Sequence, residues 1–109
     1  MAYPNYEDMD EPLLCFILLN GGEQKRVRAA STYGPLADFF GLTGEERTCP
    51  RADGRGGSQW QNRVQWARQR LINRGYLDGQ EHGYWRLTGE GQAWASRVAA
   101  RYLILRVKT

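Results

Sequence analysis

The chain has 109 residues, 41% of them hydrophobic, and a net charge of +3. This length is enough for one domain, predicted here over 1–109, and excludes a separate catalytic domain beside a binding domain. The longest apolar run, Leu13 to Leu19, is far shorter than the roughly 20 residues that cross a bilayer, and acidic residues precede it. This pattern excludes a transmembrane helix and a signal peptide, so we expect a cytoplasmic protein with no membrane contact.

Charge is distributed unevenly along the chain. Residues 1–24 carry five acidic side chains and no basic one, whereas residues 47–74 carry seven arginines and a single aspartate. Thirteen of the fifteen basic residues are arginines, whose planar guanidinium groups suit phosphates and base edges. The basic stretch indicates a polyanionic partner, although a solvated helix face can have the same composition.

Patterns in the first half predict an extended arm, three helices and a short strand. In chain order they are the arm over 1–9, a helix over 10–20, a strand within 24–28, a helical stretch ending at 40, and a short helix that opens at 43. Asp10 is the expected N-cap of the first helix, and Pro12 falls in its first turn, where a missing N–H costs little. Thr43 and Glu46 fit a capping box.

The second half predicts a loop, a long helix, a β-hairpin and a last helix. The loop covers 49–57 and holds two arginines among three glycines, the helix follows from 58 to 75, the hairpin spans 76–87, and Thr88 caps the last helix. The tail over 102–109 continues as helix or forms a strand, since period alone does not separate short apolar runs. This order of elements is that of a winged helix-turn-helix, an α+β fold that is mostly α with a small antiparallel β-wing.

The helix over 58–75 has two distinct faces. At helical spacing, its apolar side chains form one narrow stripe that we expect to face the core: Trp60, Val64, Ala67 and Leu71. The opposite side presents amides, and arginines flank it: Asn62, Gln65, Gln69 and Asn73, with Arg63, Arg70 and Arg74 on one flank and Gln61 and Arg68 on the other. Amides pair bidentately with adenine, and arginines bind phosphate or guanine, so this face suits the major groove of DNA.

We therefore expect double-stranded DNA as the partner, with this helix in the major groove and the loop and wing on the backbone. The expected DNA-binding residues are Arg51, Arg55, Ser58, Gln59, Gln61, Asn62, Arg63, Gln65, Trp66, Arg68, Gln69, Asn73, His82, Trp85 and Arg86. Trp66 lies towards the free side, where we expect it to pack on the first helix or the hairpin, the alternative being contact with a base. For Trp85 the core position is favoured. The amides favour A·T pairs, or an adenine modified at N6.

The sequence offers no convincing catalytic set. His82 is the single histidine, Cys15 and Cys49 have no zinc-type spacing, and no Ser/His/Asp or Cys/His group can be assembled. Glu23-Gln24-Lys25 matches the end of a metal-dependent nuclease motif but lacks upstream carboxylates on a shared scaffold. We expect no enzyme activity, no metal and no cofactor.

Several runs together resemble the N-terminal winged-helix domain of Mrr-type restriction endonucleases. They are Asn62–Ala67 with Leu71, Gly75–Leu77, Gly83–Thr88, Leu36–Arg47, Pro4–Tyr6 and Leu13–Leu14, and the resemblance covers about residues 3–98. It implies a winged helix that binds DNA, often modified DNA, ahead of a nuclease domain.

The chain departs from this pattern in three places. The loop at 50–57 is unusually rich in arginine and glycine, and Gly34-Pro35 interrupts a helix that is normally continuous. No nuclease domain follows in these 109 residues. A stand-alone reader, a regulator and the N-terminal piece of a nuclease all stay open.

Another class of function also fits the pattern, namely a protein-interaction or dimerisation module whose basic face meets an acidic partner, or a dimeric transcriptional regulator. Trp94, Val98, Tyr102 and Leu105 form a stripe on the last helix, and apolar residues 103 and 104 broaden it into a patch that a small core cannot cover. The patch predicts self-association as a homodimer or docking of an associated nuclease domain.

Overall fold

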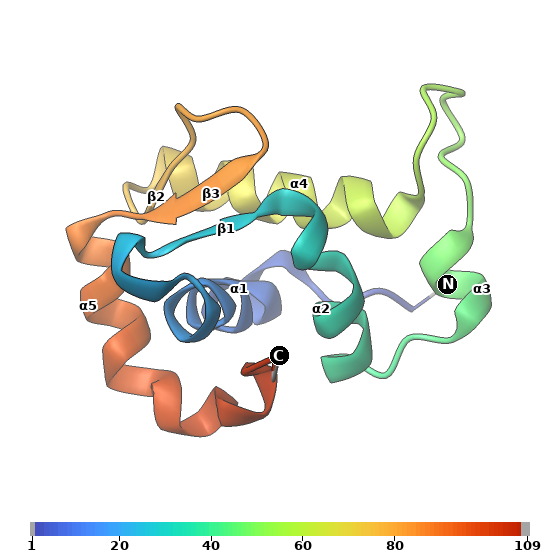
Figure 1. The fold of residues 1–109 in the computed structure, drawn as a ribbon. Coiled ribbons are helices and arrows are strands. Elements are labelled where there is room, and N and C mark those ends of the chain that lie inside the picture. The colour runs from blue at the N-terminus through green and yellow to red at the C-terminus, as the bar shows by residue number, and fades with distance from the viewer. Residues whose placement is uncertain (1, 108–109) are drawn as a thin grey trace.

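The computed structural model describes residues 2–107, in which helices pack on one side of a small sheet (Figure 1). The elements are α1 Tyr6–Asn20, η1 Gly22–Gln24, β1 Arg26–Arg28, η2 Ala29–Ser31, α2 Tyr33–Phe39, α3 Gly44–Thr48, α4 Gln59–Asn73, β2 Leu77–Asp78, β3 Tyr84–Leu87, α5 Gly89–Val98 and η3 Ala99–Leu105, where η denotes a 3-10 helix. This order confirms the predicted α+β winged helix. Within the described residues, none of the helices has the length and apolar character to cross a membrane.

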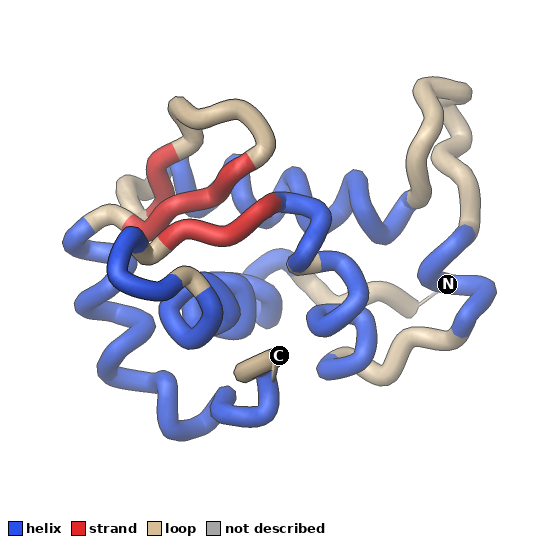
Figure 2. The backbone as a smooth tube through the Cα atoms, viewed as in Figure 1, coloured by secondary structure: helices blue, strands red, loops and turns tan. Residues whose placement is uncertain are grey.

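The sheet has three antiparallel strands in the order β1-β3-β2, drawn red in Figure 2. Val27 pairs with Trp85, and Leu77 pairs with Leu87, and all four side chains are buried. Arg86, between Trp85 and Leu87, points to solvent, which is the two-residue alternation of a sheet with one covered face. The predicted hairpin and the weak strand signal at 24–28 are both confirmed.

The core is built around α1, which lies beneath the sheet with α5 on one side and α2 on the other (Figure 1). Leu13, Leu14 and Ile17 have no exposed surface, so the apolar run is the centre of the domain. The predicted stripe of α4 is buried along its whole length, at Trp60, Val64, Ala67 and Leu71. Packing this stripe on α1 turns the opposite face of α4 outwards.

The predicted start of the first helix is wrong by four residues. The helix begins at Tyr6 after Asn5, so the described arm is only residues 2–5, with residue 1 outside the described part. Pro12 consequently lies in the helix interior. Asp10 is no cap but a buried carboxylate, 4% exposed, which pairs with Arg74 at 2.8 Å and Arg70 at 3.5 Å.

A capping rule considers only neighbours in sequence, and here the partners of Asp10 are Arg70 on α4 and Arg74 at the C-cap of α4. Burial has the largest effect on the Asp10 carboxyl and raises its pKa, against the opposing influence of Arg74 and Arg70. The acidic first helix is thus bound to the basic fourth helix by an ion-pair cluster.

The predicted caps of the later helices are confirmed. Thr43 and Glu46 form both bonds of a capping box, at 3.1 and 2.8 Å. The Ser58 hydroxyl accepts a bond from the Gln61 N–H at 3.1 Å and starts α4, while the Thr88 hydroxyl starts α5. Ser58 to Gln61 also fit a capping box in sequence, but α4 has only this one bond of the box. These residues fix where α4 begins, and therefore which side chains its free face presents.

The tail after α5 is neither a continued α-helix nor a strand. It is the 3-10 segment η3, with a kink at Tyr102 where φ is −126° and ψ is 21°. The kink lets Leu105 return to the core while the Tyr102 hydroxyl donates to Glu11 at 2.9 Å. Ile104 stays 82% exposed. Residues 108–109 of the predicted tail lie outside the described residues.

Candidate nucleic-acid interface

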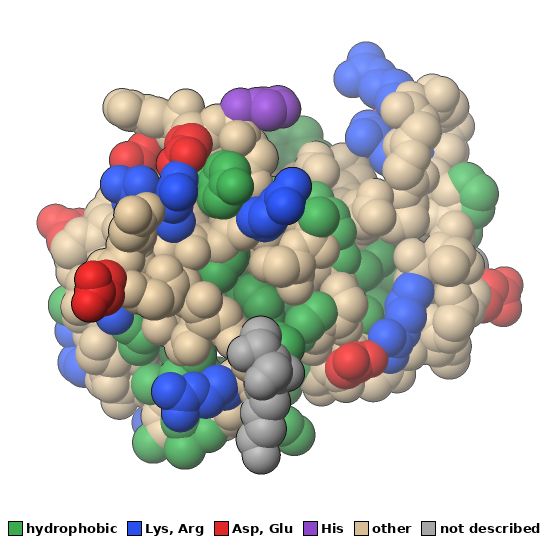
Figure 3. Space-filling view, in the orientation of Figure 1, with side chains coloured by type: hydrophobic (Ala, Val, Ile, Leu, Met, Phe, Trp, Pro, Cys, Tyr) green, Lys and Arg blue, Asp and Glu red, His purple; other side chains and the backbone are tan. Residues whose placement is uncertain are grey.

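The free face of α4 lies between two projections. One is the wing, residues 77–87, and the other is the arginine-glycine loop, residues 49–57, and both rise on the same side of α4 in Figure 1. Basic side chains, blue in Figure 3, stand at the tip of the loop at the upper right. We call the free face the recognition face, and it consists of Asn62, Gln65, Trp66, Gln69 and Asn73.

The arginine-glycine loop is a closed structure with its own bonds. A bridge between Pro50 and Ser58 closes its base, and Gly56 and Gly57 adopt φ of 78° and 74°, which glycine alone adopts readily. Inside it, the Asp53 carboxylate accepts bonds from the Arg55 N–H, at 3.0 Å, and from the Arg51 side chain. These bonds lower the pKa of Asp53. The Arg55 side chain has no ion-pair partner in the described chain and is exposed.

A hollow of 430 Å³ lies between this loop and the recognition face. Its lining residues are Arg51, Arg55, Asn62, Gln65, Trp66, Arg68 and Gln69. Trp66 is 55% exposed, so the prediction that it packs on the first helix or the hairpin is wrong. The reason is that α1 and the sheet pack on the opposite side of α4, where the apolar stripe lies.

The recognition face continues into a second hollow, of 450 Å³, beneath the wing. Arg68 donates to the Gly79 carbonyl at 3.3 Å, and its guanidinium carbon lies 5.7 Å from the centroid of the Trp85 ring. Its Nε atom is buried and has no hydrogen-bond partner in the described chain. Arg68 therefore braces the wing against α4. Trp85 is 4% exposed and belongs to the core, which leaves it no free ring face for a base.

The amides of the recognition face are partly engaged within the protein. Gln65 donates to the hydroxyl of Tyr33 at 3.0 Å, and Gln69 donates to Asn73 at 3.0 Å. The Asn62 side chain makes no hydrogen bond within residues 2–107. Tyr33, on α2, is a neighbour that the sequence analysis missed, because no local pattern links it to α4.

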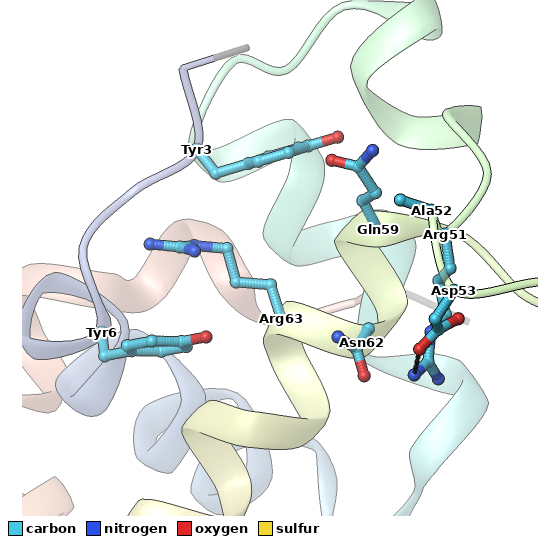
Figure 4. Close-up of a pocket in the computed structure, with 8 residues that line it drawn as sticks. All are labelled: Tyr3, Tyr6, Arg51, Ala52, Asp53, Gln59, Asn62 and Arg63. Carbon is cyan, nitrogen blue, oxygen red and sulfur yellow. Dashed lines mark hydrogen bonds and ion pairs between the residues drawn. The ribbon is translucent and has the colours of Figure 1, made fainter. Parts of the chain in front are cut away.

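A third hollow, of 390 Å³, lies where the arm meets the loop and the first turns of α4 (Figure 4). Arg63 lies between the arm and α4: it donates to the Pro4 carbonyl at 2.7 Å, and its guanidinium carbon is 4.5 Å from the centroid of the Tyr6 ring. Tyr3 donates to the Glu46 carbonyl at 2.7 Å. Arg63 is therefore an anchor for the arm, a role that the sequence analysis did not foresee.

Of the remaining predicted residues, two hold the base of the loop and the others are exposed. Ser58 caps α4 and Gln59 donates to the Pro50 carbonyl at 3.2 Å, so both hold the base of the loop. Gln61 and His82 are exposed, the latter in the turn of the wing. Arg86 is exposed and pairs with Glu81 at 3.5 Å.

The three hollows form one continuous surface, because neighbouring hollows share residues. The arm hollow and the central hollow share Arg51 and Asn62, and the central and wing hollows share Gln65 and Arg68. On the far flank of α4, Arg70 and Arg74 are held by Asp10. The basic character of the face thus comes from the loop and Arg68. No group of three metal-ligating side chains occurs among the described residues.

Comparison with family models decides where the chain belongs. The model of the Mrr N-terminal domain matches residues 6–97, from the first residue of α1 almost to the end of α5. The chain belongs to the Mrr N-terminal domain family. Membership confirms the resemblance seen in the sequence and relates the chain to restriction systems. No curated protein matches the chain, and no solved structure does.

Proposed function

We propose that this Mrr N-terminal domain is a DNA-recognition module that places α4 in the major groove of double-stranded DNA. The observation that carries the proposal is the recognition face, which is polar apart from Trp66, free of acidic residues and open between two projections. The major groove admits an α-helix, and projections on either side of such a helix reach the phosphate backbones that border the groove.

Each part of the surface has a role in this arrangement. Arg55 and Arg51 on the loop contact phosphates on one side, and His82 and Arg86 on the wing contact them on the other. Such contacts position the protein and supply affinity that falls with salt. Breaking the bond between Arg51 and Asp53 would free a second guanidinium group for the backbone.

Sequence preference comes from the amides. Asn62, Gln65 and Gln69 offer the donor and acceptor pair that matches N6 and N7 of adenine, and each good pair is worth roughly 1–3 kcal/mol of discrimination. We therefore propose a preference for A·T pairs or for adenine modified at N6. Catalysis is not part of the proposal: a nuclease domain or a separate nuclease would cut the DNA that this domain recognises.

The test compares two substitutions on a duplex selected from a random pool and on a random duplex. Gln65→Ala should weaken binding to the selected duplex by the equivalent of roughly 1–3 kcal/mol and leave random binding intact. Arg55→Ala should weaken both and lower the slope of log affinity against log salt by about one. Gln92→Ala and Arg97→Ala, exposed on α5, are matched controls without effect. Affinity that does not change between low and physiological salt would contradict the proposal.

A second candidate function is protein interaction through the C-terminal patch. Leu103, Ile104 and Val107 are 58%, 82% and 48% exposed, and Phe39 beside them is 36% exposed. An apolar surface of this kind marks a contact site for a second copy or another domain. Light scattering at high concentration tests self-association: a strictly monomeric mass would exclude a homodimer of this chain, and Ile104→Ser should abolish any dimer that forms.

A further inference from the structure

Trp66 differs from the other tryptophans of the domain in its exposure. It is 55% exposed, whereas Trp60 and Trp85 are 1% and 4% exposed, and Trp94 is partly buried with its indole N–H donating to Glu11. No side chain among residues 2–107 bonds to the indole N–H of Trp66 or packs a ring or guanidinium group on it. An indole has a large apolar surface, so its position in solvent is unfavourable until a ligand covers it.

The surroundings of Trp66 limit what that ligand can be. Trp66 lines the central hollow, with Asn62 one turn before it and Gln69 one turn after it on the same face of α4. Arg51 and Arg55 line the same hollow from the loop. The apolar ring therefore lies within a polar, basic surface, which suits a ligand that is polar and anionic but carries a small apolar group.

Major-groove DNA has that composition. Its base edges are donors and acceptors, and its apolar group is the C5-methyl of thymine, which lies beyond O4 on the same major-groove edge as N7 and N6 of the paired adenine. When an Asn or Gln side chain binds the adenine, a side chain one turn away on the same helix face therefore lies near the methyl group.

We propose that Trp66 is a specificity-determining residue that packs its indole on the C5-methyl group of a pyrimidine in the major groove. The proposal rests on the proposed function and adds the chemical group that is read. Thymine supplies this methyl in every A·T pair, and 5-methylcytosine supplies the same group in a G·C pair. Asn62 and Gln69 then bind the adenine edge while Trp66 covers the methyl of the same or the next pair.

The experiment measures binding of the full chain to matched duplexes that differ only in the methyl group. The probes are a duplex of alternating A·T pairs, its counterpart with uracil for thymine, a G·C duplex, and its counterpart with 5-methylcytosine. Trp66→Ala removes the ring, Trp66→Phe keeps an apolar ring, and Gln92→Ala on α5 is the control. Circular dichroism confirms that each variant folds, which the exposure of Trp66 leads us to expect.

We expect the wild-type protein and the Gln92→Ala control to bind the thymine duplex about fourfold more tightly than the uracil duplex, the factor that burial of one methyl group produces. Trp66→Ala should bind the two equally, and Trp66→Phe should retain part of the preference. Tighter binding to the 5-methylcytosine duplex than to the unmodified G·C duplex supports reading of the methyl group on either pyrimidine. Equal binding to these two duplexes restricts the reading to thymine. Equal wild-type affinity for thymine and uracil, or a preference that survives Trp66→Ala, overturns the inference while leaving DNA binding in place. Binding to none of the duplexes overturns the proposed function itself.

Discussion

Removal of the Asp10 carboxylate tests how the acidic first helix and the basic fourth helix are held together. Asp10→Ala deletes a side chain that is 6% exposed and leaves two arginines, Arg70 and Arg74, without their buried partner. Hydrogen bonds to charged groups are worth about 1.5–3 kcal/mol, and loss of one member of a buried ion pair costs about 3–5 kcal/mol. Both arginine side chains are partly exposed, at 32% and 44%, and can recover hydration. We therefore expect a loss of about 2–3 kcal/mol in the free energy of unfolding.

Urea denaturation followed by circular dichroism measures this loss. Glu7→Ala is the matched control, because Glu7 is on the same helix and approaches the same Arg70, but at 4.0 Å with a side chain that is 78% exposed. Exposed pairs of this kind contribute about 0–1 kcal/mol. If the two variants lose the same stability, burial does not determine the strength of the cluster and the reasoning is wrong.

Two further predictions concern the last helix and its tail. Burial and the bond to Glu11 raise the pKa of Tyr102 to about 12, above the ordinary tyrosine value of 10.0. The stabilising effect of Tyr102 should therefore be complete below pH 10 and be lost as the pH rises through 12. Between pH 10 and pH 12, Tyr102→Phe should therefore lose less stability than the wild-type protein; a parallel loss in urea midpoint would refute this. Gly91→Ala should destabilise the domain by about 1–3 kcal/mol, because its Cβ would collide with the Tyr76 carbonyl oxygen. Gly89→Ala, with open space around it, should stabilise by up to about 1 kcal/mol, and thermal melts that rank the two alanine variants the other way would contradict the packing argument.

The elements that the sequence predicted well are those determined by neighbours within a few residues. The capping box at Thr43, the cap at Ser58 and the apolar stripe of α4 depend on spacing along one helix, and all are found. The predicted start of the first helix was wrong because Asp10 resembles a cap by composition, while its partners lie 60 and 64 residues away, on α4 and at its C-cap. The prediction for the tail was incomplete because the kink lies at Tyr102, whose hydroxyl bonds to Glu11, 91 residues earlier in the chain.

The same distinction applies to the candidate site. The direction of Asn62 and Gln65 follows from helical periodicity, and both line the central hollow as that periodicity predicts. Periodicity also puts Trp66 towards the free side, but whether a neighbour covers it depends on how α4 docks on the core. Arg63 was expected to be free, yet the arm folds back on it, because the Pro4 carbonyl and the Tyr6 ring lie within its reach. Contacts between distant segments carry no local signal.

The last elements of the chain, α5 and η3, cover α1, and this order has a consequence for synthesis. Cys15 on α1 donates to the Ala95 carbonyl, 80 residues later, and Asn20 donates to the Leu105 carbonyl, 85 residues later. At roughly 5–20 residues per second, the ribosome needs between about 4 and 17 s to make that interval. During this time the most apolar helix of the domain has been translated while α5 and η3, which cover it, do not yet exist. The nascent chain therefore presents an unprotected hydrophobic segment, and we expect slow translation across residues 21–105 to increase its dependence on chaperones.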